Sequence, residues 1–133
     1  MRVALVSTAL LAIVTACAAP QTSSGPTAAP KAGQPTPDPV LVNEGQQLVA
    51  QKGCAGCHTI PGIPGATGTI GPNLAGVANR PSIAGGAVQN NGPDDLKRWV
   101  LDPPAVKPGT AMPKLGLTDD EAARIAAFLE TLK

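Results

Sequence analysis

The segment CAGCH, from Cys54 to His58, constrains this chain more than any other stretch of its sequence. It brings two thiols together with the only histidine among 133 residues. A structural zinc site would need four ligands, whereas the chain after its N-terminal segments offers only two cysteines and this one histidine. A thioredoxin-like dithiol would need a strand–helix–strand context, which the flanking Gly- and Pro-rich sequence does not offer. Both common uses of a C-x-x-C pair therefore fit poorly.

The pattern C-x-x-C-H is instead the attachment signature of c-type haem. A helical turn between Cys54 and Cys57 lets each thiol reach one vinyl group, and the adjacent His58 then points at the iron. One covalently bound haem c is therefore the expected cofactor. It would also supply bulk that the side chains lack, since Trp99 and Phe128 are the only aromatic residues. Without haem, we expect no compact fold.

Met112 is the expected second axial ligand of that iron. It is the only methionine left once Met1 is removed with a signal segment. It lies in an irregular Pro-rich segment without helical periodicity, which argues against a role as core filler. Ligation by histidine and methionine raises the reduction potential of a haem. Lys114 as ligand, or a vacant position, is the alternative.

Residues 1–16 have the pattern of a secretory signal peptide. A positively charged start precedes a 12-residue apolar run, Val3–Val14, which is short of the ~20 residues that span a bilayer. The small residues before Cys17 resemble a bacterial lipoprotein signal, in which Cys17 becomes the lipidated first residue. Ordinary cleavage after a small residue would instead discard Cys17. We expect export, with a lipid anchor at the outer face of the bacterial cytoplasmic membrane or in the periplasm.

Residues 17–42 are interpreted as a flexible Pro-rich tether. Six of the 15 prolines lie between Pro20 and Pro39, with Ser, Thr, Gly and Gln between them and no apolar periodicity. Such a segment buries too little apolar surface to offset its ordering entropy. The tether would let a folded domain move near the membrane.

Residues 43–133 are expected to form one all-α domain of three to four short helices and Gly/Pro-rich loops around the haem. Helices are predicted over Glu44–Lys52, Pro93–Leu101 and Thr118–Leu132, the last opened by a capping box of Thr118 and Glu121. No alternating strand pattern is present. Lys and Arg number eight in this part, as do Asp and Glu, and this balance argues against a nucleic-acid binder.

This domain resembles a class I cytochrome c. The motifs that carry the resemblance are Gly45, the C-x-x-C-H segment, the GPNL segment from Gly71, the PGTAMP segment from Pro108, and Phe128. The segments 80–86 and 99–109 are similar to the cytochrome c domain fused to subunit II of some bacterial haem-copper oxidases. The double-spanning segment and copper-binding cluster of such a subunit are not recognisable here.

The resemblance implies roles for further residues. The carbonyl of Pro72 would accept a hydrogen bond from the axial histidine, and Leu74 would pack on the haem face. Arg80 and Thr110 would bond propionates, and Trp99 would lie beside the haem on the methionine side. A simple turn at Pro72, a solvated Arg80 and a plain core role for Trp99 are the alternatives.

The resemblance also implies that the first and last helices cross where Gly45 admits the ring of Phe128. Val49 departs from the family here, because a second aromatic residue often stands at its position. That departure puts the tightness of the crossing in doubt.

The expected function is single-electron transfer in a respiratory chain by a monomeric carrier that is not an enzyme. Similarity to an oxidase subunit favours a terminal haem-copper oxidase as acceptor and a quinol-oxidising complex as donor. A haem-based ligand sensor or a small haem subunit of an oxidoreductase complex is the alternative. The docking face is expected to be largely apolar, with Ile60, Pro61, Ile63, Ala111 and Pro113 at its rim and few charges, of which Lys52, Lys107 and Lys114 are the candidates.

Overall fold

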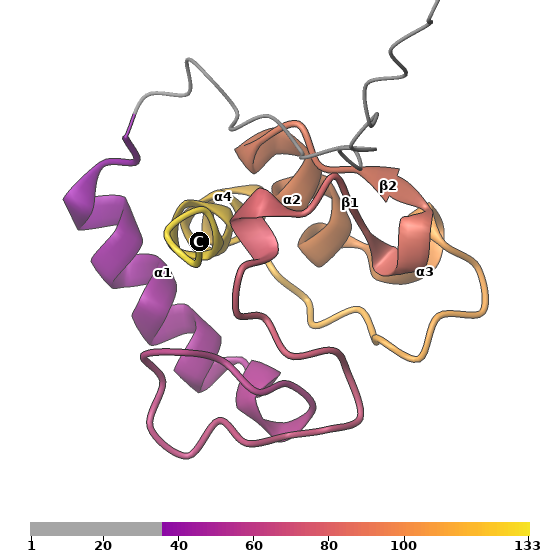
Figure 1. Cartoon of the computed structure of the whole chain (residues 1–133), viewed down its shortest axis with the longest axis horizontal. Coiled ribbons are helices and arrows are strands. Elements are labelled where there is room, and N and C mark those ends of the chain that lie inside the picture. Colours follow the sequence, from indigo (N-terminus) through magenta and orange to yellow (C-terminus); the bar gives the residue numbers. More distant parts are fainter. Residues whose placement is uncertain (1–35) are drawn as a thin grey trace, which may run out of the picture.

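The structure, a computed structural model, describes residues 36–133. The predicted signal segment, Cys17 and most of the predicted tether lie outside these residues. The elements in chain order are α1 (Pro39–Gln51), β1 (Ser82–Ile83), β2 (Val88–Gln89), α2 (Pro93–Leu101), α3 (Pro103–Val106) and α4 (Asp119–Leu129). Four short helices with long connecting loops confirm the expected fold class (Figure 1). Between residues 36 and 133, no helix has the length and apolar character needed to cross a membrane.

Helix α1 begins earlier than the sequence pattern predicted. Its first residue is Pro39, and the side chain of Asp38 caps it by accepting a hydrogen bond of 2.8 Å from the Val40 N–H. Residues 39–42, predicted as the end of the tether, are therefore helical, and the helix starts five residues before its predicted first residue, Glu44. Val40 and Leu41 are exposed and only Val42 of this first turn packs against the core, so the turn shows no apolar periodicity.

Helix α4 lies between α1 and α2 and packs against both (Figure 1). The predicted capping box is confirmed: the Thr118 hydroxyl accepts from the Glu121 N–H at 3.1 Å, and the Glu121 carboxylate accepts from the Thr118 N–H at 2.9 Å. The helix ends at Leu129, three residues before the predicted end. Its buried face makes it the centre of the domain.

Helices α1 and α4 cross in close contact at Gly45. A Cβ added there would lie 1.9 Å from the carbonyl oxygen of Arg124 and 3.0 Å from the Cβ of Phe128. Val49, one turn later, is only 1% exposed, so the position without the family's usual aromatic is still filled. The crossing is therefore tight despite that departure.

A two-stranded hairpin interrupts the all-helical pattern. Strands β1 and β2 pair antiparallel, with Ser82 opposite Gln89 and Ile83 opposite Val88. The sequence predicted no strand, because two residues are too few to show alternation. The buried Asn90 follows β2, and its amide donates two hydrogen bonds of 2.9 Å to the backbone of the preceding loop. This bonding fixes the loop that precedes the hairpin.

Candidate cofactor site

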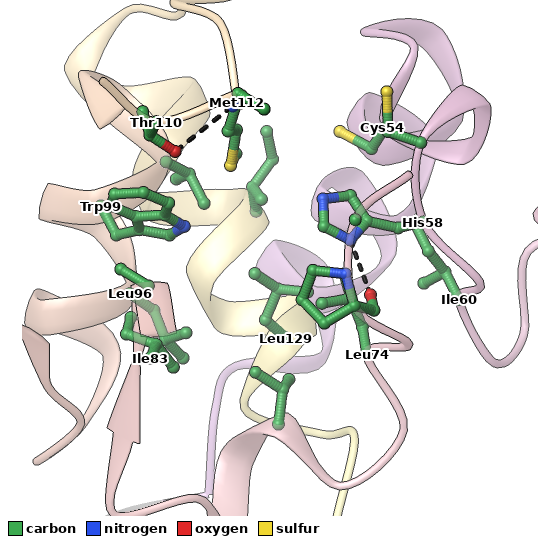
Figure 2. Close-up of a pocket in the computed structure, with 18 of the residues that line it drawn as sticks. Cys54, His58, Ile60, Leu74, Ile83, Leu96, Trp99, Thr110, Met112 and Leu129 are labelled. Carbon is green, nitrogen blue, oxygen red and sulfur yellow. Dashed lines mark hydrogen bonds between the residues drawn. The ribbon is translucent and has the colours of Figure 1, made fainter. Parts of the chain in front are cut away.

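A cavity of about 640 Å³ lies at the centre of the described part of the chain. Its walls come from α2, α4, the CAGCH turn, the hairpin and the loop between α3 and α4 (Figure 2). The predicted site residues that fall within the described range all line it: Cys54, Cys57, His58, Pro72, Leu74, Arg80, Trp99, Thr110 and Met112. The fold therefore brings together residues that span nearly 60 positions of sequence, from residue 54 to residue 112.

The two thiols and the histidine belong to one tight turn. A 3₁₀ turn covers Cys54–Gly56, and the Cys54 carbonyl accepts hydrogen bonds from the N–H groups of Cys57 (3.2 Å) and His58 (3.0 Å). Both cysteines are free thiols. Burial raises the pKa of the Cys54 thiol, and the nearby Cys57 adds to that rise. The Cys54 thiol is thus held in its protonated form, and both thiols are unpaired and line the cavity.

The His58 ring is held in one orientation by the segment that follows the thiols. Its Nδ1 lies 2.7 Å from the carbonyl oxygen of Pro72. A carbonyl can only accept, so Nδ1 carries the hydrogen and the lone pair is left on Nε2. A Cβ on Gly71 would lie 2.3 Å from the ring carbon Cε1, so only glycine lets the backbone approach this closely. The sequence signal for this role is the glycine directly before Pro72, the first residue of the GPNL segment.

Met112 faces His58 from the other side of the cavity. Figure 2 shows the Met112 sulfur and the His58 imidazole directed into the cavity from opposite walls. The Thr110 hydroxyl accepts a hydrogen bond of 3.3 Å from the Met112 N–H, which leaves the hydroxyl hydrogen free to donate. The half-buried Trp99 lies on the Met112 side (Figure 2). Two good donors for a transition metal therefore face each other across an apolar space.

The polar lining of the cavity is cationic. Arg80 donates hydrogen bonds to the backbone carbonyls of Asn73 and Ala75, so it braces the loop around Leu74. Lys107 donates one of 2.9 Å to the carbonyl of Ala84. No aspartate or glutamate of residues 36–133 lines the cavity. Sequence reasoning had placed Lys107 only among candidate surface charges, because its partner lies 23 positions away.

Part of the predicted apolar rim was wrong. Ile60 and Ile63 are 3% and 7% exposed and belong to the core. The antiparallel bridge between Thr59 and Thr67 folds this loop back on itself and turns both side chains inward. Ile70, which sequence reasoning did not select, is 78% exposed and lines the mouth of the cavity.

The donor set fits a covalently held haem. Two free thiols on one turn suit two thioether bonds, and an imidazole Nε2 opposite a thioether sulfur suits two axial positions. Apolar side chains from three helices, among them Val49, Leu96 and Leu129, provide walls for a large flat ring. The volume lies within the range of about 300–1,000 Å³ that is usual for cofactor sites.

Comparisons with known proteins agree with this fit. Residues 42–133 match the family described as Cytochrome c. The chain is 33% identical over 99 residues to cytochrome c oxidase subunit 2 of Alkalihalophilus pseudofirmus, a match that covers 73% of this chain and 27% of that protein. It is 34% identical over 95 residues to a cytochrome c homolog of Bradyrhizobium diazoefficiens, with 62% and 50% covered. The solved structure of SoxXA from P. pantotrophus matches with a TM-score of 0.50 at 25% identity, over 68% of this chain and 80% of that one.

The chain spans about a quarter of the length of the oxidase subunits and half that of the homolog. What it shares with the oxidase subunits is thus one domain of a larger protein. The family match covers nearly all the described residues, and the same residues enclose the cavity with its thiols and histidine. The chain belongs to the cytochrome c family, whose members bind haem c covalently and carry electrons.

Proposed function

We propose that this protein is a monomeric, monohaem cytochrome c that carries single electrons in a respiratory chain and is not itself an enzyme. The observation that supports this most is the convergence of Cys54, Cys57, His58 and Met112 on one cavity. Cys54 and Cys57 would form the thioether bonds, with His58 and Met112 as the axial ligands. When bound, the haem supplies a reversible one-electron couple between its ferric and ferrous states.

The protein's contribution is to hold the two ligands still. The hydrogen bond to Pro72 orients the His58 ring and raises the basicity of Nε2, as such partners of metal ligands do. Thr110 restrains the backbone of Met112. With His58 and Met112 both holding the iron, a substrate would find no open coordination position. Ligands held this rigidly would also keep structural change between the two oxidation states small, which would favour electron transfer over bond chemistry.

An apolar docking face at the mouth of the cavity would serve the electron partners. Ile70, Pro72, Ala111 and Pro113 are exposed and line this mouth. Two of the three candidate lysines are already neutralised, since Lys52 pairs with Glu121 and Lys114 with Asp102. Faces of this kind suit the small, transient encounters of redox proteins. Transfer rates that change little with added salt would support this face, and a steep fall would contradict it.

The acceptor in this proposal is a terminal haem-copper oxidase, and the donor is a quinol-oxidising complex. The similarity to subunit 2 of cytochrome c oxidases supports the first assignment. In this proposal residues 1–16 are removed as a signal peptide and Cys17 carries a lipid. The segment up to Asp38 would then reach on the order of 60 Å from the bilayer at ~3.1 Å per residue. Labelling with a radioactive fatty acid tests the anchor, and an unlabelled protein would exclude it.

An optical and redox titration of the purified holoprotein tests the central proposal. The expected result is a low-spin haem c spectrum with one reversible one-electron transition at positive potential. Replacement of Met112 by alanine should lower the potential and open the iron to carbon monoxide. A high-spin spectrum of the unmodified protein would overturn the assignment of Met112. Rapid binding of carbon monoxide to the reduced, unmodified protein would favour the ligand-sensor alternative.

A further inference from the structure

Lys107 is a half-buried cation that lacks a counter-charge. It lines the cavity together with Arg80, and it forms no ion pair with any carboxylate of the described residues. Most other cations in this range do form such pairs: Lys52, Lys97, Arg98, Lys114 and Arg124. A charge withdrawn from water without a partner is unfavourable. The lining of the cavity therefore holds two cations and no carboxylate of the described residues.

Lys107 also connects two walls of the cavity. Its carbonyl accepts a hydrogen bond of 3.2 Å from the Thr110 N–H, so its backbone starts the turn that leads to Met112. Its ammonium donates to the carbonyl of Ala84, 2.9 Å away, in the turn between β1 and β2. Movement of either wall would stretch one of these bonds.

The turn that Lys107 contacts has an unusual backbone. Ala84 has a φ of 56° and is the one non-glycine residue with positive φ between residues 36 and 133. Gly85 and Gly86 follow with φ of 66° and 90°. A left-handed alanine is unfavourable and persists where surrounding contacts hold it, often at binding sites. The hydrogen bond from Lys107 is such a contact.

This turn lies away from the thiols. Figure 2 shows Ile83, the residue before Ala84, on the opposite side of the cavity from Cys54. A haem has its two propionates at the edge opposite its two vinyl groups. Attachment through Cys54 and Cys57 would therefore direct the carboxylates toward the side where Lys107 contacts Ala84. An ammonium has three donors, and Lys107 uses one of them on Ala84, so others remain for a carboxylate.

We propose that Lys107 is a positioning residue of the haem site, which pairs with one propionate while it holds the Ala84 turn. This inference rests on the proposed function, since it requires bound haem. The positive charge of Lys107 disfavours the extra positive charge of ferric iron. Lys107 should therefore raise the reduction potential, an effect that a purely structural tie between two loops would not produce.

The test is the reduction potential of the holoprotein with Lys107→Gln. Glutamine keeps a donor for the Ala84 carbonyl but removes the charge. We expect the redox equilibrium to shift threefold to tenfold toward the ferric state, or about 30–60 mV at 59 mV per tenfold for one electron. Lys107→Arg keeps the charge, so its redox equilibrium constant should lie within twofold of the value for the unmodified protein.

Lys97→Gln is the matched control. It removes the same charge from a side chain on α2 that pairs with Asp119 of α4 and does not line the cavity. It should change the equilibrium constant less than twofold. Equal shifts in the two glutamine variants, or none at Lys107, would overturn the inference and leave the electron-carrier proposal intact. A wild-type protein without covalent haem or a reversible one-electron transition would instead overturn the proposed function.

Discussion

At the scale of single residues, the site depends on close approaches that only particular side chains allow. His58 is held between a carbonyl acceptor at Pro72 and a backbone without a side chain at Gly71. The segment containing Gly71 is itself fixed to the haem-attachment turn, because the Gly71 N–H donates a hydrogen bond of 2.7 Å to the Cys57 carbonyl. The orientation of the proposed ligand therefore follows from backbone positions as much as from its own side chain.

Gly71→Ala should disturb the holoprotein strongly. Because the new Cβ would lie 2.3 Å from the His58 ring, the ring or the loop must move and the hydrogen bond to Pro72 must weaken. We expect a loss of about 1–3 kcal/mol in unfolding free energy, measured by denaturant titration. Gly56→Ala is the control, since nothing lies within 4 Å of a Cβ there. Equal stability of the two variants would contradict this account of Gly71.

At the scale of elements, a close crossing and ion pairs join α1 to α4, among them a pair of 2.8 Å between Glu44 and Arg124. The helices cross at Gly45, and Lys52 at the end of α1 forms an ion pair of 2.7 Å with Glu121 in the first turn of α4. Glu121 also completes the capping box of α4, so one carboxylate serves both the helix start and the link to α1. The cavity wall formed by α4 therefore depends on α1.

Gly45→Ala should lower the free energy of unfolding of the holoprotein by about 3 kcal/mol. In an ordinary helix the same change would stabilise by about 1 kcal/mol, because alanine is the better helix former. Here the added methyl meets the Arg124 carbonyl at 1.9 Å, and overpacking outweighs the gain in propensity. Denaturant titration of the holoprotein measures the loss. Gln51→Ala on an exposed position of α1 is the control, and destabilisation of similar size there would contradict the explanation.

Stability should fall in acid partly through Glu121. The hydrogen bond from Lys52, with a further one from the Thr118 N–H, lowers the pKa of Glu121 below its usual value of 4.5. The unfolded chain therefore binds the proton more readily than the folded chain does. The ionised Glu121 carboxylate stabilises the fold above pH 4.5, and this stabilisation is lost as pH falls through the lower pKa of the folded state. Midpoints of thermal unfolding, measured from about pH 6 to about pH 3, should show this loss of stability.

The matched variants for this acid effect are Glu121→Gln and Lys52→Met. The first removes the titrating carboxyl, and the second removes the largest cause of its lowered pKa. Both should flatten the fall in midpoint relative to the unmodified protein. A fall of unchanged steepness in both variants would show that other groups govern the acid response.

At the scale of the whole molecule, the cavity makes the fold depend on its cofactor. The buried core residues form one cluster, and many of them also line the cavity, among them Val49, Leu96, Ile125 and Leu129. Without a cofactor, these side chains would face an open space of about 640 Å³ and would lose the contacts that a bound ring makes with them.

Protein made without haem should therefore not hold a compact fold. Cys54→Ser with Cys57→Ser, which removes both attachment points while leaving most packing unchanged, provides such a protein. Its circular dichroism should show far less helix than the holoprotein, with no cooperative thermal transition. The control is the holoprotein under the same conditions. A cooperatively folded double variant without haem would show that the side-chain core suffices.

How much of this structure could be predicted from the sequence alone depended on how many positions of the chain separate the interacting residues. The haem-attachment turn and the capping box of α4 rest on contacts within a few positions, and the exact bounds of α2 follow from Pro93 at its start. Local sequence is sufficient there, since the partners are neighbours on the chain. The start of α1 was missed because its first turn exposes Val40 and Leu41 and packs only Val42 against the core, which is too little to produce periodicity.

The sequence by itself determined the fold class, and it predicted a haem c and nine of the residues that line the cavity. Only the tertiary structure decided that Ile60 and Ile63 lie in the core, that the Gly71 backbone touches His58, and that Lys107 contacts Ala84. These outcomes depend on how loops rich in glycine and proline close over distances of many residues. No periodic pattern encodes such closure, because it results from packing against elements elsewhere in the chain.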